Sequence, residues 1–279
     1  MPGTSTGFTL TNQPAPLRLL AADLLASRQL IVVLGRRAFF TRYRRASFGV
    51  AWAVGLPLLQ AAVMAIIFHF AVRIRIPHYP VFVFTGMFAW TFFSSALQAG
   101  SSAIVDNSSL CSRIYFPRAV MPIVSVSGNI YNFVVTIGIL LLVSIVFKVW
   151  PGVHTLLLIP ATLVAVALSI AFALVLSAVQ VYFRDVRYIV QAAVTAWFYL
   201  TPVFYPLSFL RQHNAPQLLR IIVQLNPATG LVELFRKAVY GADPQWAEEV
   251  LITLGWIALL LAIAVWLHHK YDRLFTDLL

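Results

Sequence analysis

The chain has 279 residues, of which 61% are hydrophobic and only 10% are charged. Its mean hydropathy is +0.86, whereas soluble domains carry about 25% charged residues, so a soluble enzyme is disfavoured and most of the surface is expected to face lipid. The net charge of +11, from 20 basic and 9 acidic residues, is typical of basic cytoplasmic loops in a membrane protein, and we expect no nucleic-acid partner.

The first 48 residues precede the first long apolar stretch. We expect residues 1–16, which are rich in Thr, Gly and Pro, to form a disordered tail. Residues 17–48 are predicted to form a cytoplasmic amphipathic segment at the membrane interface, because 17–34 places most of its apolar residues near one helical face. Residues 36–48 then mix arginines with aromatic rings, which suits the lipid headgroup layer. Two interpretations stay open there: a simple topogenic anchor, and a collar that touches a partner or an anionic membrane lipid.

Six stretches without charged residues follow, at 46–72, 76–105, 119–147, 149–183, 188–210 and 250–269. A transmembrane helix needs about 20 mostly apolar residues to cross roughly 30 Å of hydrocarbon, and each stretch is long enough. Backbone polar groups have to be satisfied within lipid, so each stretch is predicted to be helical. The prediction is an all-α membrane protein whose transmembrane domain, residues 49–279, has spans near 50–72, 82–104, 120–146, 155–181, 189–207 and 250–268.

A long connection, residues 208–249, joins the fifth and sixth predicted spans. It contains two short apolar pieces, 217–225 and 231–240. A helix as short as the first piece rises only about 14 Å, roughly half the hydrocarbon depth. The connection is therefore predicted to be a re-entrant helical hairpin that dips into the outer leaflet. A surface hairpin outside the membrane is the alternative.

Local signals mark the second helix of this hairpin. Asn226 followed by Pro227 is a helix-start pattern, and Gly241 is a stop of the usual kind. Glu233 stands three residues before Arg236, a spacing at which a local ion pair is the default explanation.

An arginine cluster before the first span sets the predicted orientation; its members are Arg36, Arg37, Arg42, Arg44 and Arg45. Basic residues this close to a membrane span hold that end in the cytoplasm. Six spans then return the C-terminus to the cytoplasm and place the 208–249 connection outside. Without the cluster, basic residues divide almost evenly between the two sides, so the orientation depends on it.

Motifs for several familiar chemistries are absent from the sequence. There is no G-x-x-x-x-G-K-[ST] phosphate loop and no H-E-x-x-H or C-x-x-C pattern, so neither a cofactor nor a metal site is predicted on this chain. Cys111 is the single cysteine, which excludes an intrachain disulfide. All nine acidic residues lie outside the six uncharged stretches, whereas ion-coupled carriers usually need an intramembrane acid. An ion-driven carrier is therefore disfavoured, although backbone carbonyls can also bind cations.

Aromatic rings and a few amides are what the predicted spans offer to a substrate. Ring faces with amide donors suit sugars, whose faces are apolar and whose edges carry hydroxyls, and weak contacts suit a polymer that has to slide. Many of these rings are expected to face lipid or to form interfacial belts. The residues predicted to line a substrate path are Trp90, Phe93, Gln98, Asn129, Tyr131, Asn132, Trp197 and Tyr199.

Five segments together resemble the permeases of polysaccharide-exporting ABC transporters, the family that exports O-antigens, teichoic acids and cell-wall glycans. The segments are RYRRASFGVAW at 42–52 with Pro57, SRIYFPR at 112–118, YFRDV at 182–186, TPVFYP at 201–206, and LNP at 225–227 running to Tyr240 and Gly241. Each motif is weak alone, but five in the family's order, over roughly residues 30–270, are specific to the permease family. They do not specify the glycan.

The resemblance implies an assembly of two such permeases with two separate ATPase subunits in the bacterial cytoplasmic membrane. ATP and Mg²⁺ would bind to the ATPase, and the cargo would be a lipid-linked glycan. The cytoplasmic loops would couple to the ATPase, and the external hairpin would narrow the exit. The coupling residues would be Arg113, Tyr115, Arg118, Arg184, Asp185 and Arg187, and the external gate would include Asn226, Pro227, Glu233 and Arg236.

Three functions are weighed on this basis. The first is the permease subunit of an ATP-driven exporter of a lipid-linked polysaccharide. The second is a permease of the same architecture for a small lipid or drug, which needs only an apolar pocket. The third is a membrane-embedded glycosyl or acyl transferase, which needs acid, base or metal groups near the membrane surface. It ranks last, because Asp106 and Asp185 stand on separate predicted loops without matching partners.

Overall fold

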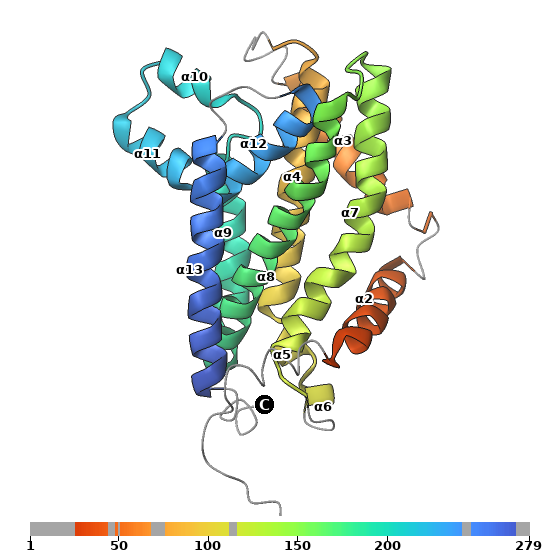
Figure 1. The fold of residues 1–279 in the computed structure, drawn as a ribbon, viewed down its shortest axis with the longest axis vertical. Coiled ribbons are helices and arrows are strands. Elements are labelled where there is room, and N and C mark those ends of the chain that lie inside the picture. The colour runs from red at the N-terminus through yellow and green to blue at the C-terminus, as the bar shows by residue number, and fades with distance from the viewer. Residues whose placement is uncertain are drawn as a thin grey trace, which may run out of the picture.

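The computed structural model describes residues 26–43, 48–49, 51–67, 76–111, 116–241 and 247–271. Every regular element in these ranges is a helix, as the sequence predicts. The α10–α11 end of the molecule lies opposite the α5–α6 end (Figure 1). The helices are α2 (Arg28–Tyr43), α3 (Ala51–Ile67), α4 (Tyr79–Ser101), α5 (Ala103–Asp106), α6 (Ser108–Cys111), α7 (Val120–Val146), the 3₁₀ helix η2 (Val153–Leu157), α8 (Leu158–Tyr182), α9 (Val186–Leu200), α10 (Leu207–Gln212), α11 (Gln217–Leu225), α12 (Pro227–Tyr240) and α13 (Ala247–Tyr271).

Four helical segments in the described ranges are long and apolar enough to cross a membrane: α4, α7, η2 with α8, and α13. They coincide with four of the six predicted spans. The bent pair of α11 and α12 would make a fifth if it counted as one span. Helix α3 lies within the first predicted span and has 17 residues, and α9 lies within the fifth and has 15. Neither helix is long enough to cross a membrane by itself. Residues 68–72 of the first predicted span lie outside the described ranges.

The fifth predicted span, 189–207, is wrong at its C-terminal end, because α9 stops at Leu200. Thr201 is extended, with φ −95° and ψ 134°, and it precedes Pro202. A proline disfavours helical geometry at the residue before it, which explains the stop. The chain then runs through a buried, non-helical segment that includes Val203 and Phe204.

The centre of the molecule is α4, which packs against α3, α7, α8, α9 and α12. Its ring Phe88 stacks on Phe133 of α7 with centroids 4.4 Å apart, and Phe235 of α12 meets Phe88 edge-on at 5.3 Å. Gly100 of α4 lies so close to Ala173 of α8 that a Cβ there would collide with the alanine methyl. Small residues of this kind let helix backbones approach closely within membranes.

The N-terminal helix α2 packs along α7 and lies beside it in Figure 1. Gly35 and Gly128 make the contact, since a Cβ on Gly128 would meet the Ala38 methyl at 3.2 Å and the Gly35 carbonyl oxygen at 3.3 Å. Ile31 and Leu34, on the predicted apolar face, pack against a buried cluster. The predicted tail, residues 1–16, and residues 17–25 of the predicted interfacial segment lie outside the described residues.

The 208–249 connection contains the predicted hairpin. Its helices α11 and α12 meet at an angle of 71°. The first coincides with the predicted piece 217–225, and the second begins at Pro227, where the helix-start pattern places it, rather than at residue 231. Most of α12 is buried against α4, α8 and α13, whereas α11 exposes most of its apolar side chains.

Candidate functional site

A groove of about 600 Å³ lies between α3, α4 and α9. Trp90, Gln98 and Tyr199, three of the predicted path residues, line it together. Gln60 on α3 and Thr195 on α9 add an exposed amide and an exposed hydroxyl. The groove therefore combines ring faces with hydrogen-bonding groups in one place.

Helical spacing explains why the polar groups of α4 meet in this groove. Thr91, Ser94 and Gln98 are three or four residues apart and so share one face of α4. On α9, Thr195 and Tyr199 are four residues apart and also share a face. The buried stripe of α9 consists of Val186, Val190 and Val194 at the same four-residue interval. One side of α9 thus packs inward and leaves its hydroxyls available to the groove.

The two predicted asparagines lie elsewhere. Asn129 and Asn132 line a hollow of about 20 Å³ between α4 and α7. A polar cavity of roughly this size holds a single water molecule and is far too small for a sugar. Thr91 lines both this hollow and the groove, so one turn of α4 separates the two spaces.

The remaining predicted path residues pack against other rings. Phe93 is fully buried, and Trp197 meets it edge-on with centroids 5.4 Å apart. The ring centroid of Tyr131 lies 5.8 Å from that of Phe39 of α2, and Tyr131 does not line the groove. Of the eight predicted path residues, the structure brings only Trp90, Gln98 and Tyr199 to a common surface.

At the α5 end of the molecule, an ion pair joins helices α5 and α9. Arg187 Nη1 of α9 lies 3.6 Å from Asp106 Oδ1 of α5, with side chains 61% and 48% exposed. Ser102 Oγ donates a 2.6 Å hydrogen bond to the other carboxylate oxygen of Asp106. The predicted coupling residue Arg187 is therefore in contact with α5, through the acid that ends this helix.

The other predicted coupling residues have different environments. Arg184 and Asp185 are exposed on the α8–α9 turn, whereas Arg118 is buried. Arg113 and Tyr115 lie outside the described residues.

Two exposed rings flank this turn and were missed as site candidates. Phe183 is 67% exposed and Tyr188 is 70% exposed. Large exposed rings beside charges are typical of protein–protein contact surfaces. The signal was present in the sequence, since both rings adjoin the Arg-Asp-Val-Arg run.

At the opposite end, the Asn226 side chain joins two helices, α9 and α12. Its Oδ1 accepts hydrogen bonds from the Ala228 backbone N–H at 2.9 Å and from Trp197 Nε1 at 2.7 Å. Its Nδ2 donates to Thr201 Oγ1 at 3.0 Å and, more weakly, to the Leu200 carbonyl at 3.4 Å. Asn226 therefore caps α12 as predicted and also ties α12 to the C-terminal end of α9.

A buried arginine holds the next turn of α12. Arg236, only 4% exposed, donates from Nη1 to Glu233 at 2.6 Å and from Nη2 to the Val203 carbonyl at 2.8 Å. Its guanidinium also lies 3.6 Å from the centre of the Phe82 ring. The predicted Glu233–Arg236 pair is thus confirmed. Gly86 of α4 permits the arrangement, because a Cβ there would come within 2.8 Å of the Val203 oxygen.

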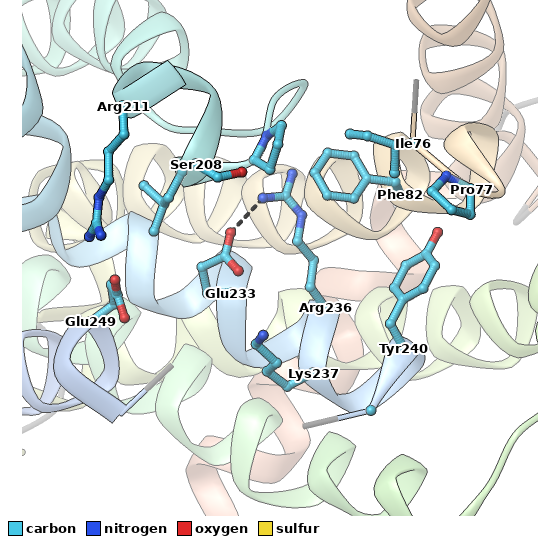
Figure 2. Close-up of a pocket in the computed structure, with 13 residues that line it drawn as sticks. Ile76, Pro77, Phe82, Ser208, Arg211, Glu233, Arg236, Lys237, Tyr240 and Glu249 are labelled. Atoms are coloured by element: carbon cyan, nitrogen blue, oxygen red, sulfur yellow. Dashed lines mark hydrogen bonds and ion pairs between the residues drawn. The ribbon is translucent and has the colours of Figure 1, made fainter. Parts of the chain in front are cut away.

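Above Arg236 is a second cavity, of about 350 Å³, which we call the outer cavity. Its walls come from the 76–77 turn, α4, residues 206–211, α12 and α13 (Figure 2). Figure 2 shows Arg211 of α10 above Glu249 of α13 at one side and Tyr240 with Pro77 at the other. The Tyr240 hydroxyl donates to the His78 carbonyl at 3.1 Å, which fastens α12 to the start of α4.

Comparison with known proteins indicates the family of the chain. The family model described as ABC-2 type transporter matches residues 29–240. The chain is 32% identical over 245 residues to the O-antigen export system permease protein RfbA of Myxococcus xanthus, covering 86% of this chain and 93% of that protein. It is also 26% identical over 247 residues to an O-antigen export system permease protein RfbA of Klebsiella pneumoniae, covering 87% of this chain and 92% of that protein.

Proposed function

The chain belongs to the ABC-2 type transporter family, and on that premise we propose that it is the permease subunit of an ATP-driven exporter of a lipid-linked polysaccharide. The observation that carries the proposal is the similarity to O-antigen export permeases over more than four-fifths of the chain. A separate ATPase subunit supplies the energy and carries ATP and Mg²⁺. This division agrees with a sequence that has no phosphate-binding loop.

In this proposal the chain crosses the bacterial cytoplasmic membrane six times. The spans are α3, α4, α7, α8 with η2, α9 and α13, and both termini lie in the cytoplasm. A 15-residue helix such as α9 rises only about 22 Å, and the buried segment 201–204 continues it toward the outer surface. The short length of α9 is tolerated because this non-helical chain is covered by protein, which is the condition for irregular backbone at membrane depth.

The two ends of the molecule then have distinct tasks. The end with α5 and the α8–α9 turn faces the cytoplasm, where Arg187, Arg184 and the exposed Phe183 contact the ATPase. The end with α10, α11 and α12 faces outward, and the hairpin dips into the outer leaflet. α2 lies at the cytoplasmic interface, where its exposed Arg36 and Phe40 reach lipid headgroups; the arginine lies 5.7 Å from the ring centre.

The groove between α3, α4 and α9 forms the conduit together with a second copy of the chain. It is open along one side of a single copy, and its exposed residues Gln60, Gln98 and Tyr199 are available to face a partner. A glycan passing between two such grooves meets rings and amides but no fixed charge, so it is held weakly enough to slide.

Blocking the groove tests the proposal. Thr195 is exposed in the groove, so Thr195→Trp fills it without disturbing the core. Leu163 on α8 is 65% exposed and does not line the groove, so Leu163→Trp is the matched control. In cells whose chromosomal copy is deleted, we expect the wild type and Leu163→Trp to restore surface polysaccharide. Thr195→Trp should leave the lipid-linked glycan inside the cell.

Normal surface polysaccharide in the deleted strain would contradict the proposed function. Full export by a stably inserted Thr195→Trp would contradict the placement of the conduit.

A groove of about 600 Å³ also lies within the range of about 300–1,000 Å³ typical of small-molecule pockets, which favours drug or lipid export as the second candidate. That candidate predicts that Thr195→Trp lowers drug resistance and leaves surface polysaccharide unchanged.

A further inference from the structure

The three helices around the groove present neutral polar groups to it. Helices α3 and α4 contain no charged residue, and the single charge on α9, Arg187, lies in its first turn and is paired with Asp106 at 3.6 Å. Every described residue that lines the groove is uncharged. The polar part of the lining consists of the amides of Gln60 and Gln98 and of four hydroxyl groups. A glycan in the groove therefore meets polar groups but no opposite charge from the described lining.

Two of the hydroxyls are left as hydrogen-bond acceptors by bonds within their own helices. Ser94 Oγ donates to the Thr91 carbonyl at 3.2 Å, and Thr195 Oγ1 donates to the Gln191 carbonyl at 3.0 Å. A serine or threonine hydroxyl has one hydrogen to donate and two lone pairs with which to accept. Because the hydrogen of each group is already used, the two oxygens can offer only lone pairs to a ligand.

A neutral sugar and an acidic sugar differ in how well they match this lining. A sugar hydroxyl can donate to the oxygens of Ser94 and Thr195 and can accept from the two amides, whereas an ionised carboxylate or phosphate oxygen can only accept. An anion therefore meets lone pair against lone pair at both acceptor positions. It also loses hydration without gaining an opposite charge, which is costly in surroundings of low dielectric constant. The lining thus favours the neutral sugar.

The length of the groove makes this preference act throughout the passage of a polymer. The groove follows α4 from Met87 to Gln98, a rise of about 16 Å, so more than one sugar unit lies in it at a time. A polymer with an acidic group on every unit would keep a charge in the groove during its whole passage. The phosphate of a lipid carrier, by contrast, would pass only once for each polymer.

We propose that the groove selects neutral glycan units over units that carry a carboxylate or a phosphate, with Ser94 and Thr195 as specificity-determining acceptors. The inference rests on the proposed function and narrows its substrate class to an uncharged polysaccharide. It disfavours a polyol-phosphate polymer such as a teichoic acid, in which every unit carries a phosphate.

The substrate class is tested by deleting the gene in its own organism. The polysaccharide that disappears from the cell surface is purified from the wild type, and its repeat is analysed by mass spectrometry and by assays for uronic acid and phosphate. We expect a repeat of neutral sugars. An acidic group in every repeat would overturn the inference but leave the proposed function intact, because export would still depend on the chain. Unchanged surface polysaccharide in the deleted strain would contradict both.

Binding to the full chain in lipid nanodiscs tests whether the selectivity lies in the groove. The probes are cellobiose and cellobiouronic acid, which differ only by a carboxylate in place of one CH₂OH group, and saturation-transfer NMR measures the ratio of their signals. We expect the wild type to favour cellobiose about fivefold, the effect of roughly one hydrogen bond. Thr195→Lys adds a cation to the groove and should reverse the preference. Gln191 is exposed one turn away on α9 and does not line the groove, so Gln191→Lys is the matched control and should keep the preference.

A blocked groove completes the test. Thr195→Trp should abolish the signals of both probes, whereas Leu163→Trp should leave them as in the wild type. Equal binding of the two probes or no binding of cellobiose by the wild type would overturn the inference. So would a ratio in Thr195→Lys equal to that in Gln191→Lys, or cellobiose binding that persists in Thr195→Trp. The export assay in cells is measured separately, so the proposed function does not depend on these signals.

Discussion

The two ends of α9 are attached to the rest of the molecule in different ways. At the C-terminal end, which the proposed function makes the outer end, Trp197 and Thr201 are both hydrogen-bonded to the buried Asn226, at 2.7 and 3.0 Å. At the inner end, Arg187 and Asp106 form an ion pair at 3.6 Å, and both side chains are about half exposed or more.

The two kinds of attachment differ in strength for a physical reason. Breaking a buried hydrogen bond strands polar groups away from water, at about 1–3 kcal/mol for each group. An exposed ion pair loses little, about 0–1 kcal/mol, because water replaces the partner. The outer end of α9 therefore moves together with α12, whereas the inner end can exchange its partner without unfolding the helix. In the proposed function, this arrangement would suit a helix that contacts the ATPase at one end and moves with α12 at the other.

The outer attachment depends in turn on the contact between α12 and α13, and Gly230 is its tightest point. A Cβ on Gly230 would collide with the Glu249 carbonyl oxygen and with Thr253 Oγ1. Thr253 Oγ1 also bonds the Pro227 carbonyl at 2.9 Å, next to the cap. We expect Gly230→Ala to lower the free energy of unfolding by about 3 kcal/mol, because backbone cannot yield as a flexible side chain can. Thermal unfolding of the purified protein in detergent measures the change.

Gly255→Ala is the matched control for that variant. Gly255 lies on α13 with open space around its Cβ position. There the substitution should stabilise the protein slightly, by about 0.5–1 kcal/mol, because alanine favours the helix. Similar unfolding of the two variants would show that α12 does not pack on α13 as closely as described.

Asn226→Ser separates the two roles of Asn226, which are to cap α12 and to bond to α9. Serine still caps α12, but it is too short to keep both bonds to α9. We expect a loss of about 2 kcal/mol in the free energy of unfolding, chiefly from the stranded Trp197 N–H, since Thr201 keeps its hydrogen bond to the Trp197 carbonyl. Spin labels on exposed residues of α9 and α11 should report a broader distance distribution by electron paramagnetic resonance.

Trp197→Phe identifies the bond responsible for that effect. It removes the indole N–H but keeps a ring against Phe93 and Phe172. Combining it with Asn226→Ser should add less than the sum of the single effects, since both remove the same hydrogen bond. Additive losses would mean that Asn226 and Trp197 do not act on each other.

Local patterns in the sequence predicted much of this outer region. The cap at Asn226, the stop at Gly241 and the Glu233–Arg236 pair all arise from residues within one or two helical turns, so short-range spacing was sufficient. The apolar lengths likewise placed α4, α7, α8 and α13. The early end of α9 had a local signal too, the proline after Thr201, but the apolar run masked it.

The contacts between distant segments were not predictable in the same way. Nothing near Trp197 in the sequence indicates that its N–H bonds to a residue 29 positions away, and so its ring was assigned to the path. Gly86 and Gly230 lie in close contact with backbone from distant parts of the sequence. The need for glycine at these positions is therefore visible only in the structure. The asparagines of α7 were grouped with Gln98 by chemistry alone, and packing placed them on the other side of α4.

The inner end gives the smallest expected effect on stability and the sharpest contrast with the outer end. Arg187→Gln removes an exposed ion pair, so the free energy of unfolding should change by less than about 0.5 kcal/mol. If the inner end exchanges partners with an ATPase, polysaccharide export should nevertheless fall. Exchanging the charges, with Asp106→Arg and Arg187→Asp together, should restore the contact between α5 and α9 but not the contact with the ATPase. Stability would stay close to that of the wild type while export stays low, and full export by the exchanged pair would show that the ion pair only holds the two helices together.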